Sequence, residues 1–165
     1  MSRFLLPWQK SDITFYTTEV LVLGSGIAGL YTAIKAAQQR YQVIVLTKKD
    51  VAEGNTEHAQ GGIAAAIDES DSPSLHFEDT LKAGAGLCNE EAVRILVEEG
   101  PRRVRELIDM GACFDRIGGL LALTREGAHS RNRVLHAQGD ATGWEIERTL
   151  VAQVKQRPLI EVREY

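Results

Sequence analysis

Residues 19–29 read EVLVLGSGIAG, and this stretch decides the fold. The apolar run at residues 19–24 is short, rich in Val and Leu, and closed by a glycine, which predicts a strand buried on both faces. Immediately afterwards, residues 24–29 form the sequence GxGxxG. In this setting the first glycine permits a tight turn, the second lets the backbone approach a pyrophosphate, and the third packs the following helix against the strand.

A helix and a second strand follow the glycines. Leu30, Ala33, Ile34 and Ala37 recur at i, i+3, i+4 and i+7, which predicts a helix ending near residues 39–40. Residues 42–47 (QVIVLT) then predict a second buried strand. Strand, helix and strand in this order form a βαβ unit with parallel strands and a right-handed crossover. We therefore predict an α/β, Rossmann-like FAD/NAD(P)-binding fold that starts with this unit and adds further helices.

Two further helical regions are expected in the middle of the chain. Residues 74–83 read as a helix, and Asn89 is placed to cap a second one, with acidic residues in its first turn. We expect that helix to pause at Gly100 and a further one to begin at Pro101. Gly111 is placed to end it.

The last third of the chain predicts a mixture of elements. Glycines and alternating patches at residues 116–137 indicate a small hairpin or irregular β-segment. Residues 140–156 predict a helix with Asp140 as its N-cap, and residues 159–164 another strand. We expect residues 1–18 to be a lead-in to a domain that spans residues 19–165.

Composition narrows the class of protein. The 165 residues are 44% hydrophobic and 25% charged, with a net charge of −4 and no basic block, which argues against nucleic acid or an anionic membrane as a partner. Two isolated cysteines exclude a disulfide framework and a cysteine zinc site, and no apolar stretch is long enough to span a membrane. We therefore expect a cytoplasmic protein without a metal site. Arg131 and Arg133 read as a solvated face.

The type of dinucleotide is not settled by the glycines. In NAD-binding domains an acidic residue near the end of the second strand holds the ribose hydroxyls. Here Thr47 occupies that place and Lys48 follows it. This argues against a plain NAD dehydrogenase. Lys48 is either an ordinary exposed lysine or a contact to the adenosine half of the cofactor.

A second unusual stretch lies at residues 53–66 (EGNTEHAQGGIAAA), whose small side chains bury little apolar area. Together with the strand that ends in LTK, it resembles the flavoprotein family of succinate dehydrogenase, fumarate reductase and L-aspartate oxidase. The resemblance implies that this loop runs across the isoalloxazine end of FAD. The implied cofactor-binding residues are Gly24, Ser25, Gly26, Ile27, Ala28, Gly29, Lys48, Asn55, Thr56, Glu57, His58, Ala59, Gln60, Gly61 and Gly62. Respiratory members attach FAD covalently to a histidine where this chain has Asn55, so non-covalent FAD is implied.

Three further stretches resemble the L-aspartate oxidase branch of that family: residues 78–89 (EDTLKAGAGLCN), 123–130 (LTREGAHS) and 136–143 (HAQGDATG). The resemblance implies that Glu126 faces the amino group of the substrate. The alternative is a surface glutamate paired with Arg125. His129 and His136 read as structural hydrogen-bonding residues, with a direct chemical role as the alternative.

The resemblance also implies a reaction. L-Aspartate would be oxidised to iminoaspartate with oxygen or fumarate as electron acceptor, as the first step of NAD biosynthesis, with quinolinate synthase receiving the product. Residues 19–165 would be the N-terminal part of the FAD-binding domain. A capping domain, the catalytic base and the C-terminal part of the FAD-binding domain would lie outside this chain, which alone should be inactive. Two alternatives stay open: a soluble flavoprotein like fumarate reductase or succinate dehydrogenase, and a truncated, non-catalytic dinucleotide-binding module.

Overall fold

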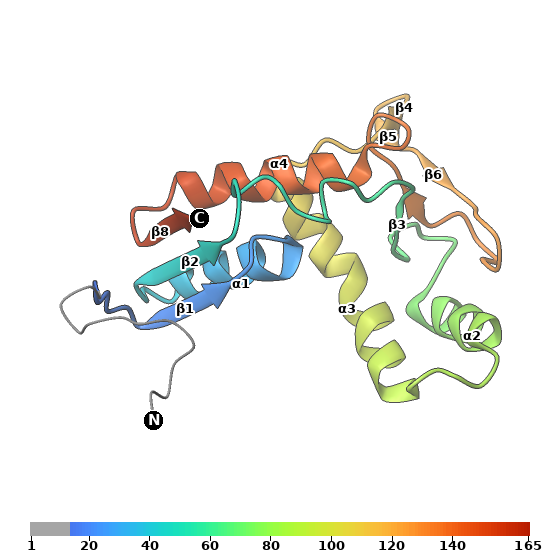
Figure 1. Ribbon diagram of the computed structural model, residues 1–165. Helices are drawn as coiled ribbons and strands as arrows, with labels where there is room; N and C mark the ends of the chain where they lie inside the picture. The colour runs from blue at the N-terminus through green and yellow to red at the C-terminus, as the bar shows by residue number, and fades with distance from the viewer. Residues whose placement is uncertain (1–13) are drawn as a thin grey trace.

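A three-stranded parallel sheet forms one end of the protein. The computed structural model describes residues 14–165, so most of the predicted lead-in lies outside the described residues. The strands are β1 (Val20–Leu23), β2 (Val43–Thr47) and β8 (Ile160–Glu164), in the order β1-β2-β8. Helix α1 (Ile27–Gln38) connects the first two strands (Figure 1). The predicted βαβ unit and the predicted last strand are confirmed.

Helix α1 covers one face of this sheet. Val22 of β1 pairs in register with Val45 of β2, and both side chains are buried. Successive side chains of a strand point to opposite faces, so every second residue meets the helix. Ala33 and Ala37 of α1 complete the cluster, and their small side chains let the helix lie close to the strands.

The opposite face of β1 is open, and the prediction that this strand is buried on both faces is wrong. Leu21 is 56% exposed and Leu23 72% exposed. The physical reason is that α1 packs against the other face of this strand, toward which Val22 points. β2 lies in the centre of the sheet and buries Ile44 as well as Val43 and Val45, as expected.

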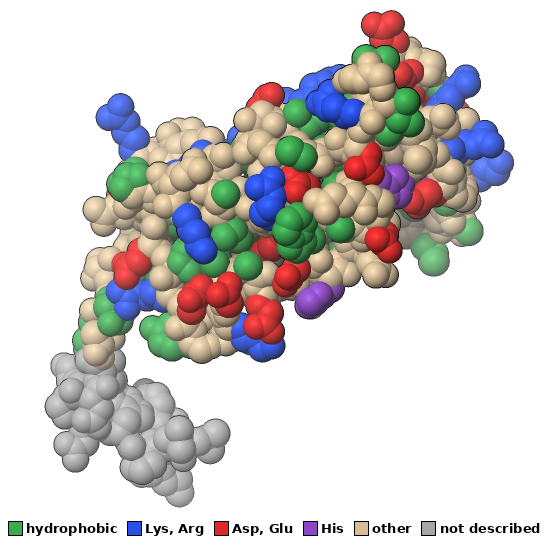
Figure 2. Space-filling model, turned by 90° about the horizontal axis from the view of Figure 1, so that it is seen from above, with side chains coloured by type: hydrophobic (Ala, Val, Ile, Leu, Met, Phe, Trp, Pro, Cys, Tyr) green, Lys and Arg blue, Asp and Glu red, His purple; other side chains and the backbone are tan. Residues whose placement is uncertain are grey.

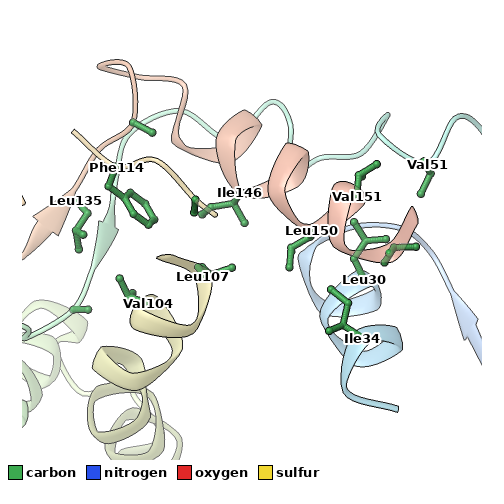
Figure 3. Close-up of a cluster of buried hydrophobic side chains, with 14 residues drawn as sticks. Leu30, Ile34, Val51, Val104, Leu107, Phe114, Leu135, Ile146, Leu150 and Val151 are labelled. Atoms are coloured by element: carbon green, nitrogen blue, oxygen red, sulfur yellow. The ribbon is translucent and has the colours of Figure 1, made fainter. Parts of the chain in front are cut away.

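Helix α4 (Thr142–Lys155) connects the two ends of the molecule, running from beside β8 to the small strands at the far end (Figure 1). Ile146, Leu150 and Val151 belong to a buried cluster to which α1 contributes Leu30 and Ile34 (Figure 3). Most positions of α4 are buried, and the buried residues include polar side chains as well as apolar ones.

The start of α4 differs from the prediction. Asp140 does not cap the helix; Ala141 occupies the cap position without a side-chain hydrogen bond. Instead, the hydroxyl of Thr142 accepts a hydrogen bond from Ala137 N at 3.1 Å. This bond closes the turn before the helix, so the helical conformation starts two residues later than Asp140.

Helix α3 (Glu90–Asp109) has the predicted ends. The side chain of Asn89 accepts a hydrogen bond from Ala92 N at 3.0 Å, which satisfies one of the free N–H groups of the first turn. Beyond the C-terminus, Gly111 has a φ of +103°, a conformation that a glycine adopts without strain.

The predicted break in the middle of α3 is wrong, because the helix continues through Pro101. Val97, Pro101 and Val104 are all buried and follow one another at helical spacing across the proline. A proline removes one backbone hydrogen bond and costs about 3 kcal/mol in a helix interior. The buried stripe, which stays in phase on both sides, offsets that cost.

The remaining elements lie at the far end of the molecule. Helix α2 (Pro73–Gly84) is confirmed, with Ser72 accepting from Leu75 N. A second sheet of short antiparallel strands has the order β3-β7-β6, and a separate hairpin joins two more strands, which confirms β-structure within residues 116–137. These strands are β3 (Ile63–Ala64), β4 (Arg116–Ile117), β5 (Leu120–Leu121), β6 (Leu123–Thr124) and β7 (Val134–Leu135).

The surface carries both signs of charge. Figure 2, which views the molecule from the side of α4, shows acidic and basic side chains interspersed among polar and hydrophobic ones. On the face shown, charges of both signs lie close together, so neither sign dominates its field. Across the part of the chain that the structure describes, none of the helices combines the length and apolarity needed to cross a membrane.

Candidate functional site

The turn between β1 and α1 is built so tightly that it requires glycine at two positions. Gly24 has a φ of +98°, and its N–H donates to Leu46 O at 2.8 Å. A Cβ atom added to Gly29 would lie 2.1 Å from Gly24 O, which no side chain can occupy. The predicted roles of the first and third glycines, a tight turn and close packing of helix on strand, agree with this geometry.

The first turn of α1 receives its cap from a distant loop. Gly26 occupies the N-cap position and has no side chain to offer. The hydroxyl oxygen of Thr56, 29 residues further along the chain, accepts a hydrogen bond from Ile27 N at 3.0 Å. Beside this turn, buried Ser25 donates to the hydroxyl of Thr47 at 3.2 Å. The two predicted cofactor-binding segments therefore meet at the start of α1.

A cleft of about 640 Å³ lies at this meeting point. It brings together Gly24 and Gly26 of the first motif, Lys48 after β2, and Asn55 of the second segment, all of which were predicted as cofactor-binding residues. Its lining consists of Gly24, Ser25, Gly26, Leu46, Thr47, Lys48, Glu53, Gly54, Asn55 and Tyr165. Ile27, Ala28 and Gly29 continue from the cleft into the first turn of α1.

The rest of the second segment does not line this cleft. His58, Ala59 and Gln60 are exposed, and Ala59 O accepts a hydrogen bond from Gly143 N at 3.0 Å. Glu57 lines a separate hollow of about 300 Å³ beside α4. The sequence predicts that residues 55–62 act together in binding the cofactor. In the structure they are divided between the cleft, α4 and the second sheet.

The glycines at the end of the segment lead the chain against β7. Gly61 has a φ of +78°. A Cβ atom on Gly62 would lie 2.3 Å from the Val134 side chain and 3.0 Å from His136 Cε1. Gly62 is therefore needed for close packing on this strand, and it brings the end of the segment next to His136.

Glu126 lies beside the same histidine. Its Oε1 is 3.5 Å from His136 Nε2, whereas the sequence suggested Arg125 as the partner of a purely surface glutamate. His136 Nδ1 is 3.1 Å from Gly139 O, and because a carbonyl only accepts, Nδ1 carries the hydrogen. In the neutral ring Nε2 then accepts from the Thr124 hydroxyl at 2.9 Å. Gly62, His136 and Glu126 therefore form a second group of neighbouring residues, apart from those that line the cleft.

The segment that follows Glu126 is anchored by a buried arginine, so the expectation of a solvated face is wrong for Arg133. Its side chain is fully buried and contacts Asp71 at 2.7 Å and Asp79 at 2.6 Å. Ser130 N also donates to Asp79, and His129 Nδ1 lies 3.2 Å from the guanidinium. Burial acts to raise the pKa of Asp79, but Ser130 and Arg133 outweigh it and hold this pKa at about 2. The carboxylates of Asp71 and Asp79 thus compensate the buried charge of Arg133. The sequence pattern gave no sign that this arginine is buried.

Helix α4 presses directly on the loop that caps α1. A Cβ atom on Gly143 would lie 2.0 Å from Thr56 O and 2.6 Å from Ala59 O. Only glycine at this position lets the helix approach the loop so closely. The loop is therefore held between the first turn of α1 on one side and the first turn of α4 on the other.

One residue of this contact was missed by sequence reasoning. Glu147 of α4 is 1% exposed, and neither of its carboxylate oxygens has a hydrogen-bond partner within residues 14–165. Burial, followed by the nearby charge of Glu57, raises its pKa to about 7, against the opposing effect of the Thr56 hydroxyl. The available signal was periodicity, since Glu147 falls on the same stripe as Ile146, Leu150 and Val154.

The cradle fits a dinucleotide. Gly29 stands where a Cβ atom has no room, Gly24 has a positive φ, and the helix that follows presents its positive N-terminal end toward the cleft. The cleft also has the volume of a small-molecule site. Fold and site together define a Rossmann-type dinucleotide-binding domain.

Comparison with known families identifies the class more closely. A model of the family described as FAD binding domain matches residues 19–165. The chain therefore belongs to this family of FAD-binding domains, and FAD is its cofactor.

Several named proteins are similar to this chain. It is 54% identical to an L-aspartate oxidase of Streptomyces coelicolor over 86% of its length, and 54% identical to one of Nostoc over 98%. It spans only 24% and 28% of those two relatives, about a quarter of their length. Among solved structures, it is similar to the Mycobacterium smegmatis Sdh1 complex (TM-score 0.83, 35% identity, 89% of this chain and 27% of that one). A quinol fumarate reductase of E. coli gives a TM-score of 0.84 at 30% identity, covering 89% of this chain and 26% of the other.

Proposed function

We propose that the protein carrying this chain is an FAD-dependent L-aspartate oxidase, which oxidises L-aspartate to iminoaspartate as the first step of NAD biosynthesis. The observation that carries the proposal is the cleft at which both predicted FAD-binding segments meet. The identity of 54% to two proteins named L-aspartate oxidase supports the choice within the family.

The cofactor would be held by residues of both segments. Free backbone N–H groups at the turn before α1 would face an anionic pyrophosphate, whereas those of Gly24 and Ile27 already donate to Leu46 O and to the Thr56 hydroxyl. Lys48 and Asn55 line the same cleft. Residues 56–62 would continue toward the flavin ring. Bound flavin supplies the acceptor for the two electrons removed from the substrate.

We propose that FAD is bound without a covalent bond, because Asn55 stands where respiratory relatives carry the attaching histidine. Acid precipitation of the flavin-loaded, full-length protein should leave the yellow colour in the supernatant. Flavin that stays in the pellet would contradict the proposal.

Glu126 is proposed to select the amino-bearing substrate. The ammonium group is what distinguishes L-aspartate from succinate in charge. At an effective dielectric of about 20, a carboxylate about 4 Å from an ammonium is worth roughly 4 kcal/mol before desolvation. A net loss of about 1–3 kcal/mol, or tenfold to a hundredfold in kcat/KM for L-aspartate, is expected for Glu126→Gln in the full-length enzyme.

Fumarate reduction separates this proposal from its closest alternative, a fumarate reductase-like enzyme, which the structural similarity to quinol fumarate reductase favours. Glu126→Gln should leave fumarate reduction unchanged or improved, because a charge that repels a dicarboxylate is gone. Glu78→Gln, which removes an exposed carboxylate from α2, is the control and should change neither activity. Equal loss of both activities in Glu126→Gln would make this residue structural and support the alternative.

The remaining parts of the proposal concern the whole protein. Residues 19–165 would be the N-terminal part of the FAD-binding domain, with the capping domain and the catalytic base elsewhere in the parent enzyme. Oxygen or fumarate would accept the electrons, quinolinate synthase would receive the product, and the enzyme would be cytoplasmic. Steady peroxide production from L-aspartate by residues 1–165 alone would show that the division of the site is wrong. No turnover by this segment is the expected result.

A further inference from the structure

Glu147 lies next to the loop at residues 54–57, which borders the FAD cleft. Its Oε1 is 3.8 Å from the position of a Cβ atom on Gly54, and that position is 3.9 Å from Gly26 Cα. Gly54 and Gly26 both line the cleft. The carboxyl group of Glu147 is therefore separated from the phosphate cradle by a single glycine of the loop.

The loop has little room to move away from this carboxyl group. On one side the Thr56 hydroxyl accepts a hydrogen bond from Ile27 N in the first turn of α1. On the other side Thr56 O lies against Gly143 of α4, where a Cβ atom would be 2.0 Å away. A charge placed on Glu147 therefore acts on a loop that is held at both ends.

None of the ion pairs within residues 14–165 includes Glu147. Glu57 faces it from the loop, and its charge disfavours ionisation. Arg148 and Lys155 line the same hollow from α4, but Arg148 is engaged with Glu145 at 2.7 Å. None of these groups makes a hydrogen bond to Glu147 within residues 14–165.

Charged groups further along the neighbouring elements are also engaged. In the loop before Gly54, Glu53 is paired with Lys49. On α1, the helix packed against α4, Lys35 contacts Glu106 of α3 at 3.1 Å. The Thr56 hydroxyl is the polar group of the loop that acts on this carboxyl group, and it lowers the pKa of Glu147 less than burial and Glu57 raise it.

We propose that Glu147 is a proton-binding positioning residue of the FAD site, protonated when the cofactor occupies the cleft beside the loop at residues 54–57, so that FAD binding takes up a proton. This inference rests on the FAD site of the proposed function. An ionised Glu147 would place a buried negative charge close to the pyrophosphate and beside Glu57. The protonated carboxyl adds no such charge and leaves the loop in contact with α1.

The sign of the effect follows from linkage. The pKa of Glu147 is raised to about 7 before any cofactor charge is added, mainly by burial. An anionic cofactor raises it further, so the complex holds a proton that the free protein has lost above neutral pH. FAD affinity should then be constant below about pH 7 and weaken by up to about tenfold per pH unit above it.

The test uses the full-length apoprotein and FAD, followed by flavin fluorescence from about pH 6 to about pH 9. The wild-type Kd should rise above neutral pH, whereas Glu147→Gln should keep its acid-limit Kd throughout. Calorimetry in two buffers with different ionisation heats should show uptake of up to about one proton per FAD at about pH 8 for the wild type and none for the variant.

A matched control lies on the same helix. Glu145 is equally buried but bonded to Arg148, so Glu145→Gln should keep the wild-type pH dependence of Kd even if the protein is less stable. Glu57→Gln is an independent variant that leaves the core intact. It should move the onset of weakening to lower pH, because Glu57 contributes to the raised pKa of Glu147.

The outcomes separate this inference from the cofactor assignment. Wild-type pH dependence and proton uptake in Glu147→Gln would overturn the role of this residue, while FAD binding itself would stand. If Glu147→Gln does not fold, an unshifted onset in Glu57→Gln would overturn it as well. Failure of the wild-type protein to bind FAD at any pH would instead contradict the FAD site.

Discussion

Two buried acidic residues on α4 face different parts of the molecule. Glu145 is 2% exposed and Glu147 is 1% exposed. Glu145 accepts hydrogen bonds from Arg148 at 2.7 Å and from Cys113 N at 2.6 Å, so it ties the helix to the loop after α3. Glu147 faces the loop at residues 54–57, hereafter the cradle loop, where the Thr56 hydroxyl lowers its pKa. Its carboxylate oxygens have no partner within hydrogen-bonding geometry in residues 14–165.

Burial alone therefore does not decide the charge of an acid. The hydrogen bond from Arg148 lowers the pKa of Glu145 despite burial, whereas burial beside Glu57 raises the pKa of Glu147 to about 7. Two glutamates that are two positions apart thus differ: Glu145 stays ionised, whereas Glu147 can gain or lose a proton near neutral pH. The partnered acid stabilises the fold, and the unpartnered acid lies at the candidate site.

The largest effect is expected from moving α4 relative to the cradle loop. In Gly143→Ala the new methyl group would meet Thr56 O at 2.0 Å, so backbone must shift and the environments of both acids change. We expect the free energy of unfolding to fall by about 3 kcal/mol or more, as measured by chemical denaturation. FAD affinity should fall in parallel.

Gly100→Ala is the control for this substitution. Gly100 is also inside a helix, but a Cβ atom there would meet nothing within 4 Å. The change should stabilise the protein by about 0.5–1 kcal/mol, because alanine favours the helix. Equal effects of the two substitutions would mean that α4 does not press on the loop.

The second prediction concerns stability against pH. The pKa of Glu147 rises from 4.5 to about 7 on folding, so its favourable contribution is complete below pH 4.5 and is lost as pH rises through about 7. Glu147→Gln should therefore raise the free energy of unfolding by about 2–3 kcal/mol above neutral pH and leave it nearly unchanged at acid pH. Denaturation curves at several pH values measure the difference, and a pH-independent effect would be inconsistent with this account.

A smaller and opposite effect is expected on the partnered side. Glu145→Gln weakens the bonds to Arg148 and Cys113 N, and we expect a loss of about 1–2 kcal/mol at neutral pH. Because the Glu145 pKa is lowered on folding, this loss should shrink as the solution is acidified. A stabilising effect in the same assay would remove the distinction between the two acids.

The smallest effect is expected at Glu57. This side chain is half-buried and contributes only part of the raised pKa of Glu147. Glu57→Gln should raise the free energy of unfolding above neutral pH by less than about 1 kcal/mol. The double variant with Glu147→Gln should show no additional gain, since the repulsion is already absent.

The parts of the fold that sequence could predict depend on local signals. The cap at Asn89, the helix end at Gly111 and the tight turn at Gly24 each arise from residues a few positions apart. For the same reason the βαβ unit was predictable, because it lies within one continuous stretch. The GxGxxG sequence also located one half of the site.

The parts that sequence could not predict depend on distant contacts. Arg133 appears polar in the sequence, and only the fold places Asp71 and Asp79 around it. The path through Pro101 is decided by burial on both sides of the residue. Likewise, the raised pKa of Glu147 arises from burial and from Glu57, which is distant in the sequence but close in the fold.

The cap that Thr56 places on α1 has a consequence for the order of folding. Most helices carry their N-cap in the preceding residue, so the cap forms together with the helix. Here the bond to Ile27 N closes a loop of 29 residues, and loop closure must precede it. We expect the first turn of α1 to form late and to exchange its amide hydrogens faster than the buried turns around Leu30 and Ile34. The end of the helix that faces the cleft would thus become rigid only when the cradle loop has docked.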